Sequence, residues 1–262
     1  MKENACMIRI EVMEMLTEER HRQILQALET KTFLTVKELV EALQVSESTI
    51  RRDLSLLEEG DYLVRVHGGA KRGQGLADEP DVNQKMALNP ELKSKMAKKA
   101  VSLIEAEETI YVDAGTSTYA LLQALDLTDV RVITNGIDHA QLCLEKGIET
   151  RLLGGKIKSE TRAIIGLTAL DQIRSYHFHK AFLGINGIDL QYGLTTPDEE
   201  EAMIKQAGIQ MANRTFVLAD VSKFDQVAFA KVGDLDEVTI ISSGMNAQML
   251  SNYRTDTQIM EA

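Results

Sequence analysis

The sequence predicts an α/β protein, with an N-terminal winged helix-turn-helix domain followed by a larger, mostly parallel α/β domain. The chain has 262 residues, of which 44% are hydrophobic and 26% charged, and this length and composition suit two globular domains. Near the N-terminus, two short amphipathic helical patterns flank a brief break, as in a helix-turn-helix. Further along, apolar strand patterns alternate with helical patterns, which is typical of a parallel sheet covered by helices.

The charge and the cysteine content exclude several classes of protein. The formal net charge of −11 argues against general attraction to nucleic acid, so any DNA-binding face must be local. Cys6 and Cys143 are too few for a disulfide framework or a four-cysteine metal site, and a reducing cytoplasm is the expected location. No apolar run approaches the roughly 20 residues of a membrane-spanning helix, so we expect no membrane partner.

Residues 1–14 contain no apolar core of signal-peptide length, and they carry both basic and acidic residues. We therefore expect a disordered tail or an upstream extension, with the usual start at Met15. The DNA-binding domain is then predicted to span residues 15–71.

Helix signals come in order along this first domain. Thr17 is a good N-cap for a helix whose apolar residues fall on one face. Thr35 and Glu38 form the T-x-x-E pattern of a capping box ahead of a second helix. After a break at residues 44–46, a third helix is predicted over Ser46–Leu57.

The third helix has two contrasting faces. At about 100° per residue, Ile50, Leu54 and Leu57 share one face, which predicts a buried stripe. Hydroxyl and basic side chains occupy the opposite face, the flanks and the preceding position: Ser46, Ser48, Thr49, Arg51, Arg52 and Ser55. Arginine is the commonest bidentate reader of guanine, so this face can fit the major groove of DNA. A merely solvated face is the alternative, and the preceding capped helix and tight turn favour DNA.

An alternating stretch, Tyr62–His67, followed by Gly68 and Gly69, predicts a β-wing behind the third helix. Basic side chains in and after this stretch are expected to contact phosphates: Arg65, His67, Lys71 and Arg72. Phosphate contacts position a protein on DNA without reading its sequence.

Residues 72–90 hold two glycines and two prolines without periodicity, which predicts a linker before a second domain over residues 91–262. Helices are expected in this domain at residues 91–104, 118–125, 138–146 and 199–212. Strands are expected at residues 109–112, 130–134, 149–153, 180–183, 215–219 and 237–242.

Small and polar residues follow five of the predicted strands, where ligands bind in open α/β sheets. The first strand leads through Asp113, Gly115, Thr116 and Ser117 into a helix, whose amides and dipole suit a phosphate. The other strand ends carry Asn135, Gly154 with Gly155, Gly184 to Gly187, and Asp220 to Lys223. One such end alone is usually only a turn, but five on one sheet edge indicate a binding site. The phosphate is expected at Gly115–Ser117 against Lys223, with a polyol facing Asp113, Asn135 and Lys205.

Several residues have simpler interpretations. Lys205 either forms a surface ion pair with Glu201 or contacts a ligand, and Lys223 either contacts the ligand or pairs with Asp220. Solvent exposure is expected for the lysines of the 91–104 helix, which are Lys93, Lys95, Lys98 and Lys99. The two imidazoles of the His177-Phe178-His179 segment lack a nearby third ligand, so we expect no metal site.

A family resemblance joins these motifs. The run Ser48-Thr49-Ile50-Arg51-Arg52-Asp53-Leu54, followed by Arg65-Val66-His67-Gly68-Gly69-Ala70, closely resembles the DeoR family of bacterial transcriptional repressors. The resemblance extends from about residue 91 to about residue 242, and includes Ala219-Asp220-Val221-Ser222-Lys223-Phe224. Within the family, the chain looks most like repressors of fructose operons. One departure is Gln44, where relatives often carry glycine at the turn.

The resemblance implies a repressor that binds double-stranded operator DNA as a dimer or tetramer. It also implies a sensor domain with a fold similar to ribose-5-phosphate isomerase, which a phosphorylated sugar such as fructose 1-phosphate would occupy. We expect no cofactor and no enzymatic activity. One alternative is an isomerase-like enzyme fused to a DNA-binding domain, but its acid-rich turn is reduced here to Asp189. Another is an architectural DNA-binding protein without a ligand. The operator, the effector and the sign of its action stay open.

Overall fold

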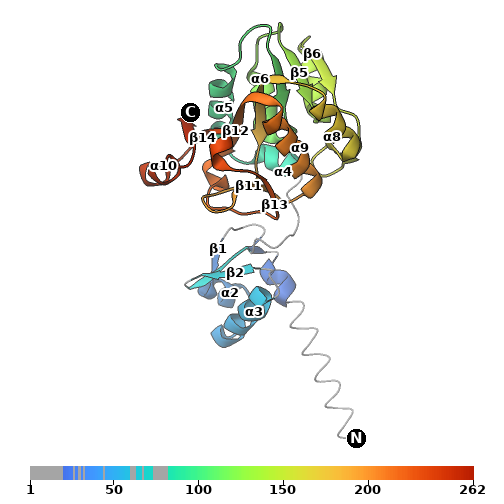
Figure 1. The fold of residues 1–262 in the computed structure, drawn as a ribbon. Coiled ribbons are helices and arrows are strands. Elements are labelled where there is room, and N and C mark those ends of the chain that lie inside the picture. The colour runs from blue at the N-terminus through green and yellow to red at the C-terminus, as the bar shows by residue number, and fades with distance from the viewer. Residues whose placement is uncertain are drawn as a thin grey trace, which may run out of the picture. The chain divides into compact units, whose positions relative to one another are not determined.

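The computed structural model describes residues 20–25, 27–28, 31, 33–43, 45–59, 63–66, 68–72 and 82–262 (Figure 1). The chain divides into two compact units, residues 1–77 and 78–262. Residues 1–14, predicted as a tail or an extension, lie outside the described part of the chain. In that part, no helix has both the length and the apolar character needed to cross a bilayer.

The first unit is a helix-turn-helix with an antiparallel sheet. Residues 20–25 and 27–28 are helical. The other elements are β1 (Phe33–Thr35), α2 (Val36–Leu43), α3 (Glu47–Glu59), β2 (Leu63–Val66) and β3 (Gly69–Arg72). Strands β2 and β3 form the predicted wing, and β1 pairs with β3 to give the order β1-β3-β2. The sequence does not predict β1, because a strand of three residues is too short to show an alternating pattern.

Two local predictions for this unit are confirmed. Thr35 and Glu38 form the capping box: the Thr35 amide donates to Glu38 Oε2 (2.8 Å), and the Glu38 amide donates to Thr35 Oγ1 (3.1 Å). Ile50, Leu54 and Leu57 are buried and form one side of the small core. The turn residue Gln44 lies outside the described residues.

The second unit is built on a seven-stranded sheet in which each pair of neighbouring strands is parallel. The strand order is β15-β14-β12-β9-β4-β5-β6. The strands are β4 (Thr109–Val112), β5 (Arg131–Thr134), β6 (Glu149–Leu152), β9 (Phe178–Gly184), β12 (Ala212–Asp220), β14 (Thr239–Ser243) and β15 (Gln258–Glu261). This confirms the predicted mostly parallel α/β architecture.

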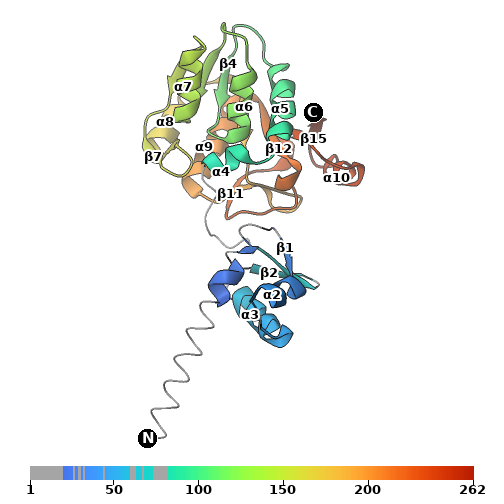
Figure 2. The ribbon, with the colours of Figure 1, turned by 180° about the vertical axis from the view of Figure 1, so that it is seen from behind.

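Helices cover both faces of this sheet. They are α4 (Val82–Ala87), α5 (Pro90–Val101), α6 (Thr116–Ala124), α7 (Ile137–Glu145), α8 (Leu167–Arg174), α9 (Glu199–Gln210) and α10 (Ala247–Tyr253). Figure 2 shows α5, α6 and α7 on one face, whereas α8 and α9 lie in front of the other face in Figure 1. Alternation along β4 separates the two cores, because Tyr111 packs on the α8–α9 side and Ile110 on the α5–α6 side.

The sequence misses the short elements of this unit. They include α4, α8, the hairpin of β7 (Lys156–Lys158) and β8 (Ala163–Ile165), and a small sheet of β10 (Gly187–Asp189), β11 (Gly193–Thr196) and β13 (Ala230–Gly233). The largest difference between prediction and structure is in the predicted linker over residues 72–90. Arg72 belongs to β3, and Val82–Ala87 form α4. Six residues give too little periodicity to reveal a helix.

The strand order creates a switch point between β4 and β9. From β4 the chain moves outward through β5 and β6, and from β9 it moves the opposite way through β12, β14 and β15. Such switch points open a crevice beyond the carboxyl ends of the strands. Glycines let the two neighbouring loops approach here, since a Cβ on Gly115 would lie 3.7 Å from the Gly184 Cα.

Candidate functional site

The two neighbouring arginines of α3 differ in their contacts with the described residues. Arg52 is exposed and, within the described part of the chain, makes no hydrogen bond or ion pair. Its neighbour Arg51 is different, because it forms an i, i+4 ion pair with Glu47 at 2.7 Å. The Arg52 guanidinium is therefore available to a base edge, whereas the Arg51 guanidinium is held by Glu47 on the same helix.

The predicted hydroxyl residues form a network around α3. Ser46 Oγ accepts from the Thr49 amide (3.2 Å) and lies within hydrogen-bond distance of the Ser48 and Thr49 hydroxyls (2.9 and 2.8 Å). Ser46 is thus the N-cap of α3. At the other end, Ser55 Oγ accepts from Arg65 Nη1 (2.8 Å), so the β2 arginine lies against α3.

The remaining wing residues stay predictions. His67 lies outside the described residues, and only the backbone of Lys71 and Arg72 is described, in β3. Sequence reasoning also missed Asp53, which is 2% exposed and pairs with Arg20 (2.6 Å) and His21 (3.1 Å). Asp53 falls on the same helical stripe as Ile50 and Leu57, and this position could have revealed its burial.

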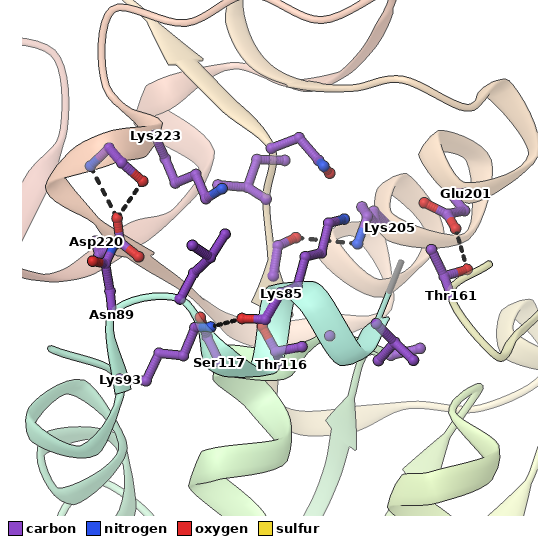
Figure 3. A pocket seen from close by; sticks show the side chains of 18 residues that line it. Lys85, Asn89, Lys93, Thr116, Ser117, Thr161, Glu201, Lys205, Asp220 and Lys223 are labelled. Carbon is purple, nitrogen blue, oxygen red and sulfur yellow. Dashed lines mark hydrogen bonds between the residues drawn. The ribbon is translucent and has the colours of Figure 1, made fainter. Parts of the chain in front are cut away.

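A pocket lies at the switch point of the second unit and encloses about 750 Å³, part of it open to solvent (Figure 3). Its walls come from α4, the start of α5, the loop after β4, the loop after β9, α9 and the end of β12. Four of its lining residues are lysines, and two are acids: Lys85, Lys93, Lys205, Lys223, Glu201 and Asp220. This excess of cations favours an anionic ligand.

The N-terminus of α6 opens into this pocket. Its N-cap is Gly115, no side chain caps it, and its first turn contains no acid. Thr116 and Ser117 line the pocket beside it. Uncapped amides at a helix N-terminus are a ready anion site, and here lysine side chains line the same pocket.

Lys93 corrects the sequence expectation of a solvated side chain. It is only 7% exposed, lines the pocket, and donates from Nζ to the carbonyl oxygen of Lys85. Burial lowers the pKa of the Lys93 ammonium, and the nearby Asp220 carboxylate opposes that shift. Lys93 shares a buried stripe with Met96 and Ala100, which is why α5 carries it inward.

Lys223 and Asp220 do not pair with each other. Asp220 Oδ1 instead accepts from the amide (2.9 Å) and hydroxyl (2.5 Å) of Ser222, and so caps the 3₁₀ turn η1 (Val221–Lys223). In the described residues, Lys223 makes neither a hydrogen bond nor an ion pair. Its ammonium is therefore open to a ligand, and the predicted contact with a phosphate stays a prediction.

Lys205 is buried, so it forms no surface ion pair with Glu201, and it is not a simple ligand-facing side chain either. It lines the pocket, but its ammonium pairs with buried Asp113 and donates to the Gly184 carbonyl (3.1 Å). Asp113 also accepts from the Gly184 amide (3.2 Å). These contacts bind β4 to β9 beneath the pocket, and Asp113 itself is not among the lining residues.

Asn135 and two glycines likewise lie away from the pocket lining. Asn135 Oδ1 is buried and accepts from Tyr111 Oη (3.0 Å) and from the Ala114 amide (2.8 Å). Gly154 and Gly155 follow β6 at the edge of the sheet, two strands from β4. There the Gly154 amide donates to Gln172 Oε1 on α8 (2.7 Å). The converging strand ends thus divide into residues that line the pocket and residues that support it.

His139 is a supporting residue that the sequence did not reveal. Its buried ring places Nε2 3.1 Å from the Gly115 carbonyl oxygen and 3.1 Å from Thr118 Oγ1, at the start of α6. Burial lowers the pKa of His139 to about 4, so the ring is neutral near pH 7. Gly136 makes room for it, since a Cβ there would lie 2.4 Å from His139 Nδ1.

The described residues contain no group of three or more His, Cys, Asp or Glu side chains arranged to hold a metal ion. His177 Nε2 lies 2.9 Å from Asn213 Oδ1, and His179 Nδ1 accepts from the Thr109 amide at 3.0 Å.

Comparisons with known proteins match both units. The family described as "DeoR-like helix-turn-helix domain" matches residues 20–74, and the "DeoR C terminal sensor domain" matches residues 88–244. A relative from Bacillus subtilis described as "Uncharacterized HTH-type transcriptional regulator FruR" is 42% identical, covering 94% of this chain and 98% of the relative. The HTH-type transcriptional repressor GlcR of the same organism is 36% identical, covering 87% and 88%. The glycerol-3-phosphate regulon repressor of Escherichia coli is 32% identical, covering 85% and 89%.

Solved structures of ribose-5-phosphate isomerases also match part of the chain. The isomerase of Methanocaldococcus jannaschii is 21% identical, covers 52% of this chain and 55% of its own, and has a TM-score of 0.39.

Proposed function

The chain belongs to the DeoR family of DNA-binding transcriptional regulators, and we propose that it represses a sugar-utilisation operon, that of fructose. In this proposal, a phosphorylated sugar such as fructose 1-phosphate enters the pocket and releases the protein from its operator. The names of its relatives support this reading, because they include a regulator called FruR and repressors called GlcR and glycerol-3-phosphate regulon repressor.

One observation carries the effector proposal: the uncapped N-terminus of α6 and the side chains of Lys93 and Lys223 line one pocket. A phosphate dianion gains from helix N-terminal amides and from positioned ammonium groups at the same time. Lys93 would serve the bound phosphate with donors not used by the Lys85 carbonyl. A neutral sugar has no group that uses this arrangement as well.

On DNA, α3 would enter the major groove with Arg52 toward a base edge. The capping network at Ser46 would hold the N-terminal turn of α3, and Arg65 beside Ser55 would lie near the phosphate backbone. We propose a dimer or tetramer, because helix-turn-helix proteins read two half-sites through two-fold symmetry.

An isomerase is the competing function, and it needs a carboxylate base at the ligand. The acid expected for that role, Asp189, accepts from the amides of Gln191 (2.8 Å) and Tyr192 (2.9 Å) in the β10–β11 turn. It is not among the pocket-lining residues. Asp189 is therefore not placed to act as this base, and of the two acids that do line the pocket, Asp220 caps η1 and Glu201 pairs with Lys158.

The experiment is an operator-release titration with the full chain. A labelled promoter fragment of the fructose operon is bound, and fructose 1-phosphate, fructose and inorganic phosphate are added separately. We expect release by fructose 1-phosphate alone at low concentration. In a thermal-shift measurement, a ligand at about 100 times its Kd stabilises the protein by roughly 2.7 kcal/mol. Turnover of ribose 5-phosphate, or operator binding indifferent to every sugar phosphate of a panel, would contradict the proposal.

A further inference from the structure

The N-termini of α6 and α9 both contribute to the pocket, and they differ in charge. The N-terminus of α6 has no side-chain cap and no acid in its first turn. The N-terminus of α9 is capped by Asp198, whose side chain accepts from the Glu201 amide, and its first turn consists of Glu199, Glu200 and Glu201. An anion gains at the first helix end and is repelled by carboxylates at the second.

Glu201 is the acid of α9 that reaches the pocket. It is 6% exposed, lines the cavity and accepts from Thr161 Oγ1 at 2.7 Å. Figure 3 places Glu201 and Thr161 on one side of the pocket and Lys223 with Asp220 on the opposite side. One side therefore offers Lys223, which has no ion pair among the described residues, next to Asp220, which caps η1. The other side, the acidic end, offers the Glu201 carboxylate, and Lys205 near it is already paired with Asp113.

The nearby cations at the acidic end are already engaged by carboxylates. Lys158 lies 3.2 Å from both Asp198 and Glu201, so one ammonium serves two acids. Lys156 pairs with Glu200 at 2.7 Å. A second phosphate arriving here would meet a carboxylate excess, and it would need one of these lysines to leave its partner.

We propose that this pocket selects a sugar monophosphate over a bisphosphate, and that Glu201 determines this specificity. The inference rests on the proposed function, because it deepens the choice of effector at the same site. The phosphate lies at the α6 N-terminus, and the hydroxyl end of the sugar lies toward Glu201. A carboxylate has only acceptor sites, so it receives hydrogen bonds from sugar hydroxyls. A second phosphate carries about −1.5 to −2 charges at pH 7 and meets like charge there.

The test compares fructose 1-phosphate with fructose 1,6-bisphosphate by calorimetry on the full chain. The wild type should bind the monophosphate at least about tenfold more tightly, because one like-charge contact of roughly 1.4 kcal/mol gives that factor. Glu201→Gln removes the charge and retains an acceptor, so it should reduce this preference about tenfold or more. Glu201→Asp retains the charge and should keep the preference.

Glu200→Gln is the matched control, because this neighbour pairs with Lys156 and is not among the lining residues. It should leave the preference unchanged. The wild-type measurement stands even where a variant fails to fold. Equal wild-type affinity for both ligands, or an undiminished preference in folded Glu201→Gln, overturns the role of Glu201. If both ligands bind equally and both release the operator, the proposed function survives and this inference fails. Binding of neither ligand overturns both.

Discussion

The recognition face of α3 and the pocket of the second unit present their cations in different ways. On α3, the guanidinium of Arg52 is exposed and has no partner among the described residues, so ligand contact and folding are separate tasks there. In the pocket, Lys93 and Lys205 are buried and also bind carbonyl or carboxylate groups of the protein. The same ammonium groups thus hold the fold and face the ligand, and Lys223 alone of these three has no such intramolecular bond in the described chain.

This difference teaches where a substitution separates function from stability. An exposed cation without a partner can be removed at little cost in folding, whereas a buried one leaves its partner unsatisfied. Arg52 and Lys223 should therefore give clean functional phenotypes. Residues beneath the pocket should change stability and ligand response together.

The largest effect is expected for Lys223→Ala. The concentration of effector that releases the operator should rise about 10- to 150-fold, because a charge-assisted contact to phosphate of about 1.5–3 kcal/mol is lost. Operator affinity without effector should stay within error, since Lys223 forms no ion pair with any residue that the structure describes. Operator complexes titrated with fructose 1-phosphate measure both quantities. Lys231→Ala is the control, because Lys231 forms an exposed pair with Asp234. A normal release curve would remove Lys223 from the site.

Asn135→Ala tests the supporting layer beneath the pocket. It leaves the buried Tyr111 hydroxyl and the Ala114 amide without their acceptor. We expect the free energy of unfolding of the second unit to fall by roughly 2 kcal/mol or more, since two buried donors lose their acceptor and each costs at least about 1 kcal/mol. Urea denaturation followed by tyrosine fluorescence reports on this unit, which contains Tyr111, Tyr119, Tyr176, Tyr192 and Tyr253. Unchanged stability would show that Asn135 is not the structural support inferred from its hydrogen bonds.

Arg52→Ala should weaken specific operator binding by about 1–3 kcal/mol if Arg52 reads a base. Lys71→Ala should instead weaken binding to all sequences alike, because the predicted phosphate contact carries no sequence information. Fluorescence anisotropy on operator and scrambled DNA separates the two cases. Neither variant should lower the melting temperature measurably. An equal loss of affinity for Arg52→Ala on both DNAs would show that Arg52 contacts phosphate and does not read a base.

The same contrast explains what could be predicted from the sequence. The recognition helix is a local structure, so its buried stripe and its capping pattern are visible at fixed spacing. The strand ends of the parallel sheet also predicted where the pocket opens. The sequence could not show which of those ends meet at the switch point, because strand order is set by long-range pairing. For that reason the sequence predicts Gly154 and Gly155 in the site with Gly115, whereas they follow the edge strand β6.

Charged residues on apolar stripes account for the other differences. Asp53, Lys93 and Glu201 are buried, and each shares a helical face with apolar neighbours. Such a position indicates a polar group that the fold carries inward, where it must be paired or face a ligand. Charge alone, without regard to position on the helix, would predict that these three side chains are exposed to solvent. The short elements were missed for a different reason, since three to six residues show no reliable period.

The smallest effect is expected in the first unit, at the capping box of α2. Thr35→Ala removes the hydroxyl that accepts from the Glu38 amide and donates to Glu38 Oε2. Loss of an N-cap hydroxyl costs about 1 kcal/mol, so the free energy of unfolding of this unit should fall by about that amount. Amide hydrogen exchange over residues 36–43, resolved by mass spectrometry, measures the change in the full chain. Lys37→Ala, an exposed position on the same helix, is the control.

The pH dependence of the same exchange sharpens this prediction. The hydrogen bond from the Thr35 amide, aided by Lys31, lowers the pKa of Glu38 to about 2. A carboxylate with a lowered pKa stabilises the fold above its unfolded pKa of about 4.3, and this contribution is lost as pH falls from there toward 2. Thr35→Ala removes one of the bonds to the charged form, so protection of α2 should depend less on pH in this range. An identical pH profile in both proteins would mean that the Thr35 amide and Lys31, and not the Thr35 hydroxyl, lower the Glu38 pKa.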